Sequence, residues 1–389
     1  MTGENGTYCQ VCGKENLEII SAYAKFARAT SDSKPWPSGG KLAVCTNCGA
    51  IQKLLDARWI EEIENIYQNY DIYQQSAGAE QLIFERDGRS GPRSKKLVNH
   101  IREQLTLPPV GKLLDIGCGN GAALRSFSEV LPSWALYGSE LSAATIKSLQ
   151  MVPRFAKLFL GKLTEIGERF ELISIIHTLE HVLSPLETLK EAANLLSHQG
   201  VLFIEVPDVE TSPFDLLVAD HLLHFSRDTL RHLLERAGFQ PISLSNDVLP
   251  KEITTLARQT RDCGVATPSP VPGIRLANDT VAWLAEVVAL LQSMANQGPV
   301  GIFGTAIAGM ALYGAIRDSV PFFVDEDPNR IGRSCDGKPI VAPANVPREI
   351  PIFLAFPPTA AQLVASRCRR IGINCILPPR MSEIAVGTV

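Results

Sequence analysis

The chain has 389 residues. This exceeds the roughly 250–300 residues over which one hydrophobic core usually grows, so two or three domains are expected. A hydrophobic fraction of 45% and a charged fraction of 20% are typical of an ordinary globular protein and exclude the disordered classes. The net charge of −4 argues against a broad phosphate-binding surface, so no nucleic-acid partner is expected.

The start of the chain, MTGENGTYCQVCGKEN, lacks the basic residues and apolar run of a secretory signal. Nowhere does the sequence approach the ~20 consecutive apolar residues of a membrane span. We therefore expect a cytoplasmic protein without a membrane partner.

Cysteines form two short repeats of the pattern CxxCG near the start of the chain. Cys9 and Cys12 belong to the first repeat, and Cys45 and Cys48 to the second. Each repeat bends the backbone into a knuckle whose amides face the sulfurs, and two knuckles together supply four thiolates for a tetrahedral Zn²⁺. An all-cysteine set leaves no open coordination position, so this zinc should be structural. A redox dithiol is the alternative.

The segment 56–75 predicts a helix and a connection, with Tyr70, Tyr73 and Ser76 just before a second helix over 94–105. From there to about residue 258, strands and helices alternate, which implies a mainly parallel sheet with right-handed crossovers. The predicted strands cover 112–117, 134–140, 170–176 and 200–206. The predicted helices cover 122–131, 184–197 and 226–238, and Ser226 caps the last of them.

A glycine-rich turn follows the first of these strands in the sequence LLDIGCGNGAAL, residues 113–124. Asp115 closes the strand, and Gly117, Gly119 and Gly121 alternate through the turn, so a ligand can approach backbone that carries no Cβ. The next strand ends in Glu140, whose carboxylate could accept hydrogen bonds from both hydroxyls of a ribose.

The turn also satisfies the spacing of a nicotinamide fingerprint, with Ala122 in its last position. Two features favour another nucleoside: the acid two residues before the first glycine, and the additional glycine at Gly121. The pattern resembles motif I of class I S-adenosylmethionine-dependent methyltransferases. We assign Tyr70 and His177 to the same cofactor site.

Histidines follow two of the predicted strands. His177, Glu180 and His181 lie where a strand delivers its carboxyl end to the ligand crevice of a doubly wound sheet. The spelling HxxEH also occurs on zinc-peptidase helices, but here it is a strand exit before a helix that begins near Pro185. His181 is the better candidate for touching substrate; the alternative for His177 and Glu180 is that they only shape the loop.

Asp220, His221 and His224 form a second cluster, between the strand 200–206 and the capped helix. An imidazole oriented by an acid titrates near neutral pH, which suits an acid/base catalyst. Methylation of carbon needs such a group, because a C–H next to a carbonyl must first lose its proton. The alternative is that one histidine of the pair only packs or caps.

Residues 258–273 break all periodicity and predict a linker. A long amphipathic helix follows, and then a second strand, glycine turn and helix, with Asp325 at the end of a further strand. This alternation predicts a second, smaller Rossmann-like unit. Its glycines, Gly301, Gly304 and Gly309, leave open an NAD-dependent oxidoreductase, although a helix-packing role fits their loose spacing better.

Four features follow one another along the chain. They are the paired knuckles, the glycine turn with Glu140, the strand exit with Glu180 and His181, and the C-terminal Rossmann-like unit. That order resembles the bacterial sugar C-methyltransferases that act on nucleotide-linked keto-deoxysugars. The resemblance implies that catalysis is carried by His181 and His221, and that the cofactor is held by Asp115, Gly117, Gly119 and Glu140.

The chain departs from that family in two places. The family motif Tyr-His-Glu-His reads Val218, Ala219, Asp220 and His221 here, so its tyrosine is missing. A family Ala-Lys-Gly turn reads 307–309 Ile-Ala-Gly, without the lysine. Both changes bear on the acceptor and leave the cofactor assignment intact.

The predicted organisation is a zinc-binding domain over 1–70, a methyltransferase domain over 71–260 and a Rossmann-like substrate domain over 275–389. We expect S-adenosylmethionine as cofactor, structural zinc, and a small-molecule acceptor, a nucleotide sugar methylated at carbon with histidine-assisted deprotonation. Alternatives are O- or N-methylation of another small acceptor, the oxidoreductase, and a scaffold without catalytic activity.

Overall fold

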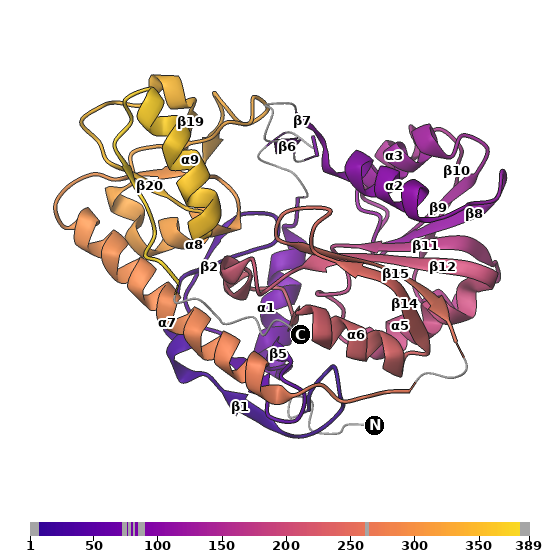
Figure 1. Cartoon of the computed structure of the whole chain (residues 1–389). Helices are drawn as coiled ribbons and strands as arrows, with labels where there is room; N and C mark the ends of the chain where they lie inside the picture. Colours follow the sequence, from indigo (N-terminus) through magenta and orange to yellow (C-terminus); the bar gives the residue numbers. More distant parts are fainter. Residues whose placement is uncertain are drawn as a thin grey trace.

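The computed structural model describes residues 8–71, 76, 79–80, 82–84, 90–260 and 264–381. Tyr73 and residues 261–263 of the predicted linker lie outside this part of the chain. Figure 1 shows three sheets, with the N-terminal strands at the bottom, a seven-stranded sheet on the right and a six-stranded sheet on the left.

The N-terminal sheet is antiparallel and has the order β1-β4-β5-β13. Three of its strands come from the first 53 residues: β1 (Leu17–Ile19), β4 (Leu42–Cys45) and β5 (Ile51–Lys53). The fourth, β13 (Leu223–His224), lies about 170 residues further along the chain and pairs Leu223 with Gln52. The segment that carries the second histidine cluster is therefore part of the sheet next to the cysteine knuckles.

Helix α1 (Ala57–Gln68) follows this sheet, as the sequence predicts. Its first turn is capped by the side chain of Asp56, which accepts a hydrogen bond from the amide of Trp59. Three buried side chains at helical spacing, Trp59, Ile63 and Ile66, form its inner face. Each contributes roughly 1.5–3 kcal/mol by leaving water, which fixes the position of the C-terminal turn beside the site described below.

The central sheet has the order β10-β9-β8-β11-β12-β15-β14, and its first five strands are parallel. The four predicted strands are confirmed as β8 (Lys112–Ile116), β9 (Ala135–Glu140), β11 (Phe170–Ile176) and β12 (Leu196–Pro207). Three further strands were not predicted: β10 (Phe155–Leu160), β14 (Phe239–Ser245) and β15 (Glu252–Gln259). The antiparallel strand β15 pairs with β12 and shows that the predicted linker, which starts at residue 258, overlaps a strand.

Helices cover both faces of this sheet (Figure 1). The first group, α2 (Arg93–Gln104) and α3 (Ala122–Val130), packs in one hydrophobic cluster that includes Leu97 and Phe127. The second, α5 (Pro185–Leu195) and α6 (Arg227–Arg236), packs in another that includes Leu189 and Leu230. A short helix, α4 (Ile146–Gln150), follows β9. The α/β fold class predicted for this region is confirmed.

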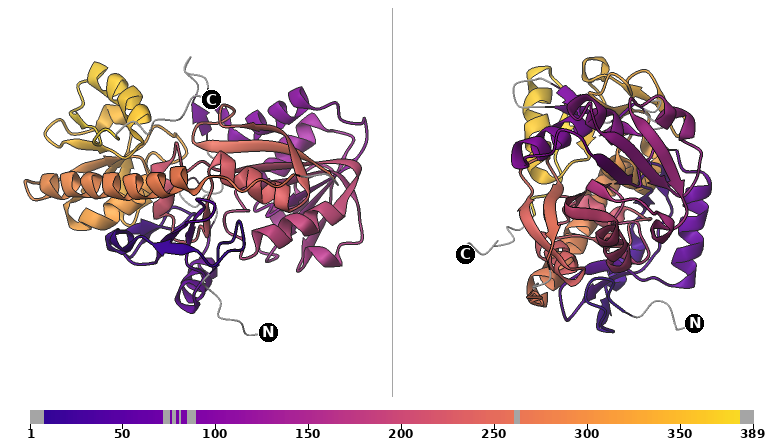
Figure 2. Two further views of the ribbon diagram at one scale, coloured as in Figure 1. Left: turned by 60° about the horizontal axis from the view of Figure 1, so that its bottom comes forward. Right: turned by 90° about the vertical axis from the view of Figure 1, so that its right-hand side faces the viewer.

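The long helix α7 (Pro270–Ala295) begins earlier than the sequence predicts. Proline is tolerated in the first helical turn, where its missing N–H has no partner to lose, so the proline-rich end of the predicted linker is helical. That turn packs on the second knuckle, because a Cβ on Gly273 would lie 2.0 Å from the carbonyl oxygen of Gly49. Figure 2 shows α7 running alongside the N-terminal strands.

The C-terminal sheet has the order β18-β19-β17-β16-β20-β21, with parallel pairing except between β18 and β19. The predicted strands appear as β16 (Gly301–Phe303), β17 (Phe323–Val324) and β20 (Ile352–Leu354), with α8 (Ile307–Ile316) and α9 (Pro358–Arg370) between or after them. The remaining strands are β18 (Ser334–Cys335), β19 (Lys338–Val341) and β21 (Cys375–Ile376). Two small ribbons pair β2 (Arg28–Ala29) with β3 (Pro35–Trp36), and β6 (Leu82–Phe84) with β7 (Ser90–Pro92).

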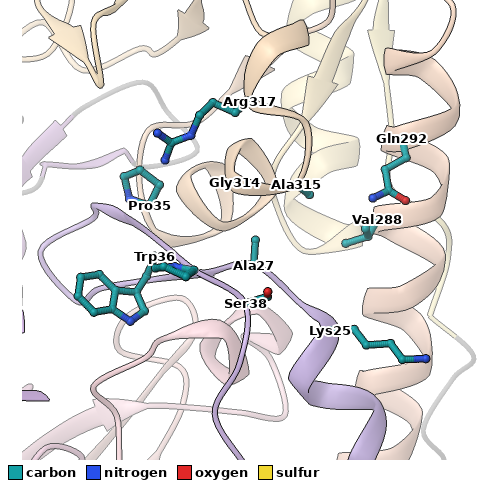
Figure 3. Close-up of a pocket in the computed structure, with 11 residues that line it drawn as sticks. Lys25, Ala27, Pro35, Trp36, Ser38, Val288, Gln292, Gly314, Ala315 and Arg317 are labelled. Atoms are coloured by element: carbon teal, nitrogen blue, oxygen red, sulfur yellow. The ribbon is translucent and has the colours of Figure 1, made fainter. Parts of the chain in front are cut away.

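We call the region from the first cysteine knuckle to helix α1 the N-terminal module. This module packs against both other sheets. Cys9, Val11 and Cys45 share a core cluster with α5 and α6, while Tyr23 shares another with α7 and α8. A pocket of about 250 Å³ lies at the second contact, lined by Trp36 and Lys25 on one side and by α7 and α8 on the other (Figure 3). None of the predicted site residues lines this pocket. In the described part of the chain, no helix combines the length and apolar character that crossing a membrane requires.

Candidate active site

The glycine turn after β8 has the backbone that its sequence predicts. Gly117, Gly119 and Gly121 have φ angles of 73°, 52° and 82°, in the left-handed region that side chains other than glycine rarely adopt. A Cβ on Gly117 would lie 2.2 Å from Oγ1 of Thr178, and one on Gly121 would lie 2.8 Å from Cδ2 of Leu149. The turn therefore requires glycine for both conformation and space, and it packs against the loop that follows β11.

Glu140 ends β9 beside this turn. Its Oε1 accepts a 2.6 Å hydrogen bond from the amide of Gly119, and its Oε2 accepts one of 3.1 Å from the amide of Leu141. The carboxylate is thus held at the edge of the glycine turn with lone pairs remaining on both oxygens. This placement fits the predicted contact with ribose hydroxyls, which stays a prediction.

Asp115 lies beneath the turn and is 2% exposed. Ser174 on β11 donates a 2.7 Å hydrogen bond to its Oδ1. Burial raises the pKa of Asp115 to about 7, although the bond from Ser174 opposes this shift. In this structure the side chain ties β8 to β11 under the glycine turn, and its direct contact with a cofactor stays a prediction.

His177 and Glu180 form an ion pair at the exit of β11. Nδ1 of His177 lies 3.0 Å from Oε1 of Glu180, and its Nε2 lies 3.4 Å from Oε2 of Glu252. Burial and Arg93 oppose protonation of the ring, but the two carboxylates outweigh them and raise the pKa of His177 to about 10. His177 also has a φ of 46°, so this loop is held in a conformation that costs energy. The residues from His177 to His181 follow strand β11 and are not helical, which agrees with our rejection of a zinc-peptidase helix.

His181 contacts both the N-terminal helix and the second histidine cluster. Its Nδ1 lies 3.1 Å from the hydroxyl oxygen of Tyr67 and 3.1 Å from the carbonyl oxygen of Asp220. Its ring meets that of His221 edge to face, with 4.6 Å between centroids. Burial, followed by the nearby His221, lowers the pKa of His181 below its usual range, so the ring is neutral near pH 7.

The carboxylate that binds His221 is Asp215, which the sequence did not single out. Nδ1 of His221 lies 2.8 Å from Oδ1 of Asp215, and Nδ1 of His224 lies 2.6 Å from Oδ2 of the same group. Asp220, the acid we expected in this role, is instead held by Ser31, whose amide and hydroxyl donate to its two oxygens at 2.8 and 2.5 Å. Asp220 still lies 3.5 Å from Nδ1 of His181.

His224 is 1% exposed, and protein groups occupy both of its ring nitrogens. Asp215 binds Nδ1, and Nζ of Lys53 lies 2.7 Å from Nε2. Because both nitrogens are occupied, His224 has no free position for a substrate atom in this structure. His221 differs, because among the residues that the structure describes none forms a hydrogen bond with its Nε2, while Nδ1 binds Asp215.

Tyr70 lies with the histidines. Its hydroxyl oxygen lies 3.3 Å from Oγ of Ser31, and its ring contacts that of Tyr67 edge to face. The predicted cofactor role of Tyr70 therefore stays a prediction. Tyr67, Asp215, Lys53 and Ser31 are the site residues that sequence reasoning missed.

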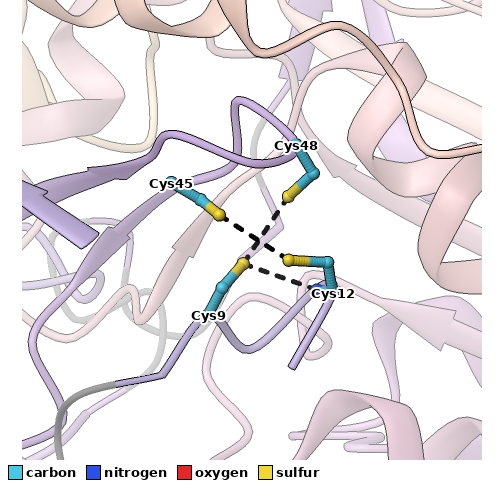
Figure 4. A group of neighbouring side chains, drawn as sticks. All are labelled: Cys9, Cys12, Cys45 and Cys48. Carbon is cyan, nitrogen blue, oxygen red and sulfur yellow. Dashed lines mark hydrogen bonds between the residues drawn. The ribbon is translucent and has the colours of Figure 1, made fainter. Parts of the chain in front are cut away.

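The four cysteines of the two knuckles come together in space (Figure 4). Sγ of Cys9 lies 3.6 Å from Sγ of Cys48, and the same distance separates Cys12 from Cys45. Four sulfurs at 2.3 Å from a zinc ion in a tetrahedron would be about 3.8 Å apart, so the spacing fits. Gly13 and Gly49 close the knuckles with similar φ angles of 74° and 76°, and the amide of each donates a hydrogen bond to the carbonyl oxygen of the first cysteine in its own repeat.

The second glycine turn, between β16 and α8, is filled by protein groups. A Cβ on Gly309 would lie 1.9 Å from the carbonyl oxygen of Gly304, so this glycine is needed for packing. Asp325 accepts a 2.5 Å bond from the hydroxyl of Thr305 and lies 3.4 Å from Nη1 of Arg330. The glycine-packing interpretation thus accounts for this turn without a dinucleotide.

Comparison with known proteins identifies the central region. Residues 92–244 match a family model described as a methyltransferase domain. The ribosomal RNA small subunit methyltransferase C of Serratia proteamaculans (strain 568) is 27% identical over 108 residues, which are 28% of this chain and 30% of that protein. The chain therefore spans less than a third of the length of that curated relative.

Two solved structures are similar to this chain at 12% identity. One is an S-adenosylmethionine-dependent methyltransferase from Clostridium acetobutylicum ATCC 824, with a TM-score of 0.37 over 51% of this chain and 98% of that one. The other is the CcbJ methyltransferase from Streptomyces caelestis, with a TM-score of 0.36 over 44% of this chain and 97% of that one. Because both TM-scores are below 0.5, these two structures carry no argument about the function of this chain.

The region that matches the methyltransferase-domain model includes the glycine turn, Glu140 and all the candidate catalytic histidines. A methyltransferase domain in this region agrees with the S-adenosylmethionine site that motif I predicts.

Proposed function

We propose that this enzyme methylates carbon in a nucleotide-linked keto-deoxysugar. The single observation that carries the proposal is the Asp215–His221 pair, which lies beside His181 near the exit of β11. An imidazole whose Nδ1–H is bound by a buried carboxylate presents Nε2 as a base and is stabilised when it takes up a proton. Oxygen and nitrogen nucleophiles need little help of this kind.

The cofactor would be held at the turn of Gly117, Gly119 and Gly121, with Glu140 binding its ribose. The three glycines hold the turn in its left-handed conformation beside Glu140, and this carboxylate supplies the acceptors that two hydroxyls need. When bound, S-adenosylmethionine supplies an electrophilic methyl group on sulfur.

The residues of the chain would prepare the acceptor. Nε2 of His221 removes a proton from the carbon next to the carbonyl, and Asp215 stabilises the imidazolium that results. Loss of that proton leaves an enolate, whose carbon is the nucleophile that C-methylation requires. His181 lies against His221 and would hold or return a proton at the acceptor oxygen.

We also propose the three-part organisation over 1–70, 71–260 and 275–389, with zinc bound by Cys9, Cys12, Cys45 and Cys48. The sulfur spacing supports a closed tetrahedral site, which would hold the N-terminal module without taking part in the chemistry. The C-terminal unit would contribute to binding the nucleotide part of the acceptor.

The test uses the zinc-loaded chain with S-adenosylmethionine and a panel of nucleotide-linked keto-deoxysugars. Mass spectrometry should detect a methylated sugar, and NMR should place the new methyl group on carbon next to the carbonyl. Transfer to oxygen or nitrogen would contradict C-methylation while retaining the methyltransferase assignment. A second assay omits the cofactor and follows exchange of the acidic C–H in D₂O, which should require His221.

A further inference from the structure

A chain of buried polar groups extends behind His221. Asp215 binds His221 and His224 at 2.8 and 2.6 Å, and His224 binds Lys53 at 2.7 Å. Nζ of Lys53 also donates to the carbonyl oxygen of Leu216 at 2.8 Å. Lys53 and His224 are 0% and 1% exposed, so both contacts are shielded from bulk solvent.

The chemistry of these groups fixes where each proton lies. An ionised carboxylate only accepts, so His221 and His224 must both donate from Nδ1 to Asp215. His224 then has only a lone pair at Nε2, which accepts from the ammonium of Lys53. His221, by the same reasoning, keeps its lone pair at Nε2.

We infer that Asp215, anchored by His224 and Lys53, is the positioning residue that sets the tautomer and basicity of His221. This inference rests on the proposed role of His221 as the base. Both carboxylate oxygens of Asp215 bind imidazole nitrogens, so Asp215 acts through His221, in the manner of the carboxylate in a hydrolase triad.

The charges in this chain support the inference. Burial opposes ionisation of Asp215, but His221 and His224 outweigh it and hold the pKa of that carboxyl well below its usual range. Burial also opposes protonation of His221, but Asp215 outweighs it and raises the pKa of His221. Burial, followed by Lys53, lowers the pKa of His224 to about 4, so this ring stays neutral.

Burial lowers the pKa of Lys53 itself to about 7, against the opposing attraction of Asp215. Other charged groups face the chain from the elements packed around it. Those near His221 are His181, Glu180 and Asp220, and those that act on Lys53 are Asp220, Arg28 and Glu62. The ring of Tyr23 lies under the ammonium, 4.8 Å from Nζ.

The anchor comes from a different module than the base. Lys53 is the last residue of β5, in the N-terminal sheet, and His224 lies on β13, which pairs with β5. This pairing brings the lysine and the histidine together across 171 positions of sequence.

The test is an NMR titration of the zinc-loaded full chain labelled with ¹³C at histidine Cε1, with the His221 signal assigned through His221→Gln. Asp215→Asn should lower the pKa of His221 by at least about one unit, because the opposite charge next to the ring is lost. The matched control is Asp327→Asn, which removes another buried aspartate, 4% exposed, in the C-terminal unit. An unchanged His221 pKa in an Asp215→Asn protein that binds S-adenosylmethionine normally would overturn the inference.

Lys53→Met tests the anchor and serves as the second variant if Asp215→Asn does not fold. It should raise the pKa of His224, because the cation that opposes protonation of that ring is gone. An unchanged His224 pKa would remove Lys53 from the inference. Neither titration uses an acceptor, so failure of C-methylation and failure of the positioning role are separate results.

Discussion

The hydroxyl oxygen of Tyr67 lies 3.1 Å from Nδ1 of His181, although 114 positions separate the two residues. The same nitrogen lies 3.1 Å from the carbonyl oxygen of Asp220, which can only accept. A neutral His181 must therefore carry its proton on Nδ1 and share it between the two oxygens. The hydroxyl hydrogen of Tyr67 is then available to another acceptor, such as an oxygen of the substrate.

The first prediction concerns this hydroxyl group. Tyr67→Phe should lower kcat about three- to tenfold, the equivalent of one hydrogen bond worth ~0.5–1.5 kcal/mol, while the Kd for S-adenosylmethionine stays unchanged. Steady-state kinetics and calorimetry measure the two quantities. Tyr8→Phe, which changes another partly exposed tyrosine of the N-terminal module, is the control. A wild-type kcat in Tyr67→Phe would show that the hydroxyl takes no part.

Removing the carboxylate of Glu140 should weaken cofactor binding. Glu140→Ala loses the ribose hydrogen bonds, so the Kd for S-adenosylmethionine should rise roughly tenfold, or ~1–2 kcal/mol. Calorimetry on the zinc-loaded chain gives the value. Glu129→Ala removes an exposed glutamate of α3 and should leave the Kd unchanged. Equal affinities in the two variants would argue that the ribose lies elsewhere.

A methyl group at Gly117 should damage the cofactor turn. Gly117→Ala combines a left-handed φ with a Cβ 2.2 Å from Thr178, so the turn must move or the chain must lose stability, by at least ~1–2 kcal/mol. Thermal unfolding with and without S-adenosylmethionine should show a lower Tm and a smaller stabilisation by the cofactor. Gly167→Ala is matched, because a Cβ there meets nothing within 4 Å.

The rate should depend on pH with a known sign. His221 acts as a base only when neutral, and Asp215, outweighing burial, raises its pKa above the ordinary value of 6.5. The ring is therefore protonated and inactive at pH values below the raised pKa, and kcat/KM should rise with pH with a midpoint above 6.5. Because the pKa of His181 is lowered, that ring is already neutral in this range and adds no second rising limb. A midpoint below 6.5 would speak against His221 as the base.

Loss of one thiolate should release the metal. Cys45→Ser should bind less than stoichiometric zinc and unfold at a lower temperature, because Cys9, Cys45 and Cys48 are buried in the core shared with α5 and α6. Metal analysis and calorimetry measure both effects. Cys375→Ser, in the C-terminal sheet, should retain zinc. Full zinc content in Cys45→Ser would exclude the four-cysteine site.

Features that depend on local spacing could be predicted from the sequence. The glycine turn, the two knuckles, the cap at Ser226 and four strands of the central sheet each follow from residues within a short window. The predicted linker, 258–273, begins before β15 ends. It also extends into α7, because a proline in a first helical turn gives the same composition as a loop.

The partners of the histidines could not be predicted, because they depend on pairing across the chain. Asp220 stands next to His221 in sequence, yet Ser31 binds its carboxylate, and Asp215 reaches the ring because a 3-10 turn over Pro213–Leu217 folds back toward β13. Tyr67 lies on the amphipathic helix α1. The hydrophobic pattern of that helix predicts which of its side chains are buried, but it does not predict a contact between Tyr67 and His181.

The pairing of β5 with β13 has a consequence for how such a protein can be divided or recombined. Strand β5 belongs to the cysteine-bearing region, and β13 belongs to the region with the candidate catalytic histidines. A fragment that lacks the first 53 residues would therefore leave β13, with His224, without its partner strand. Grafting a foreign N-terminal region onto the catalytic region would require a replacement for Lys53 as well as for the strand. We therefore expect the two regions to fold together and to be exchangeable only together.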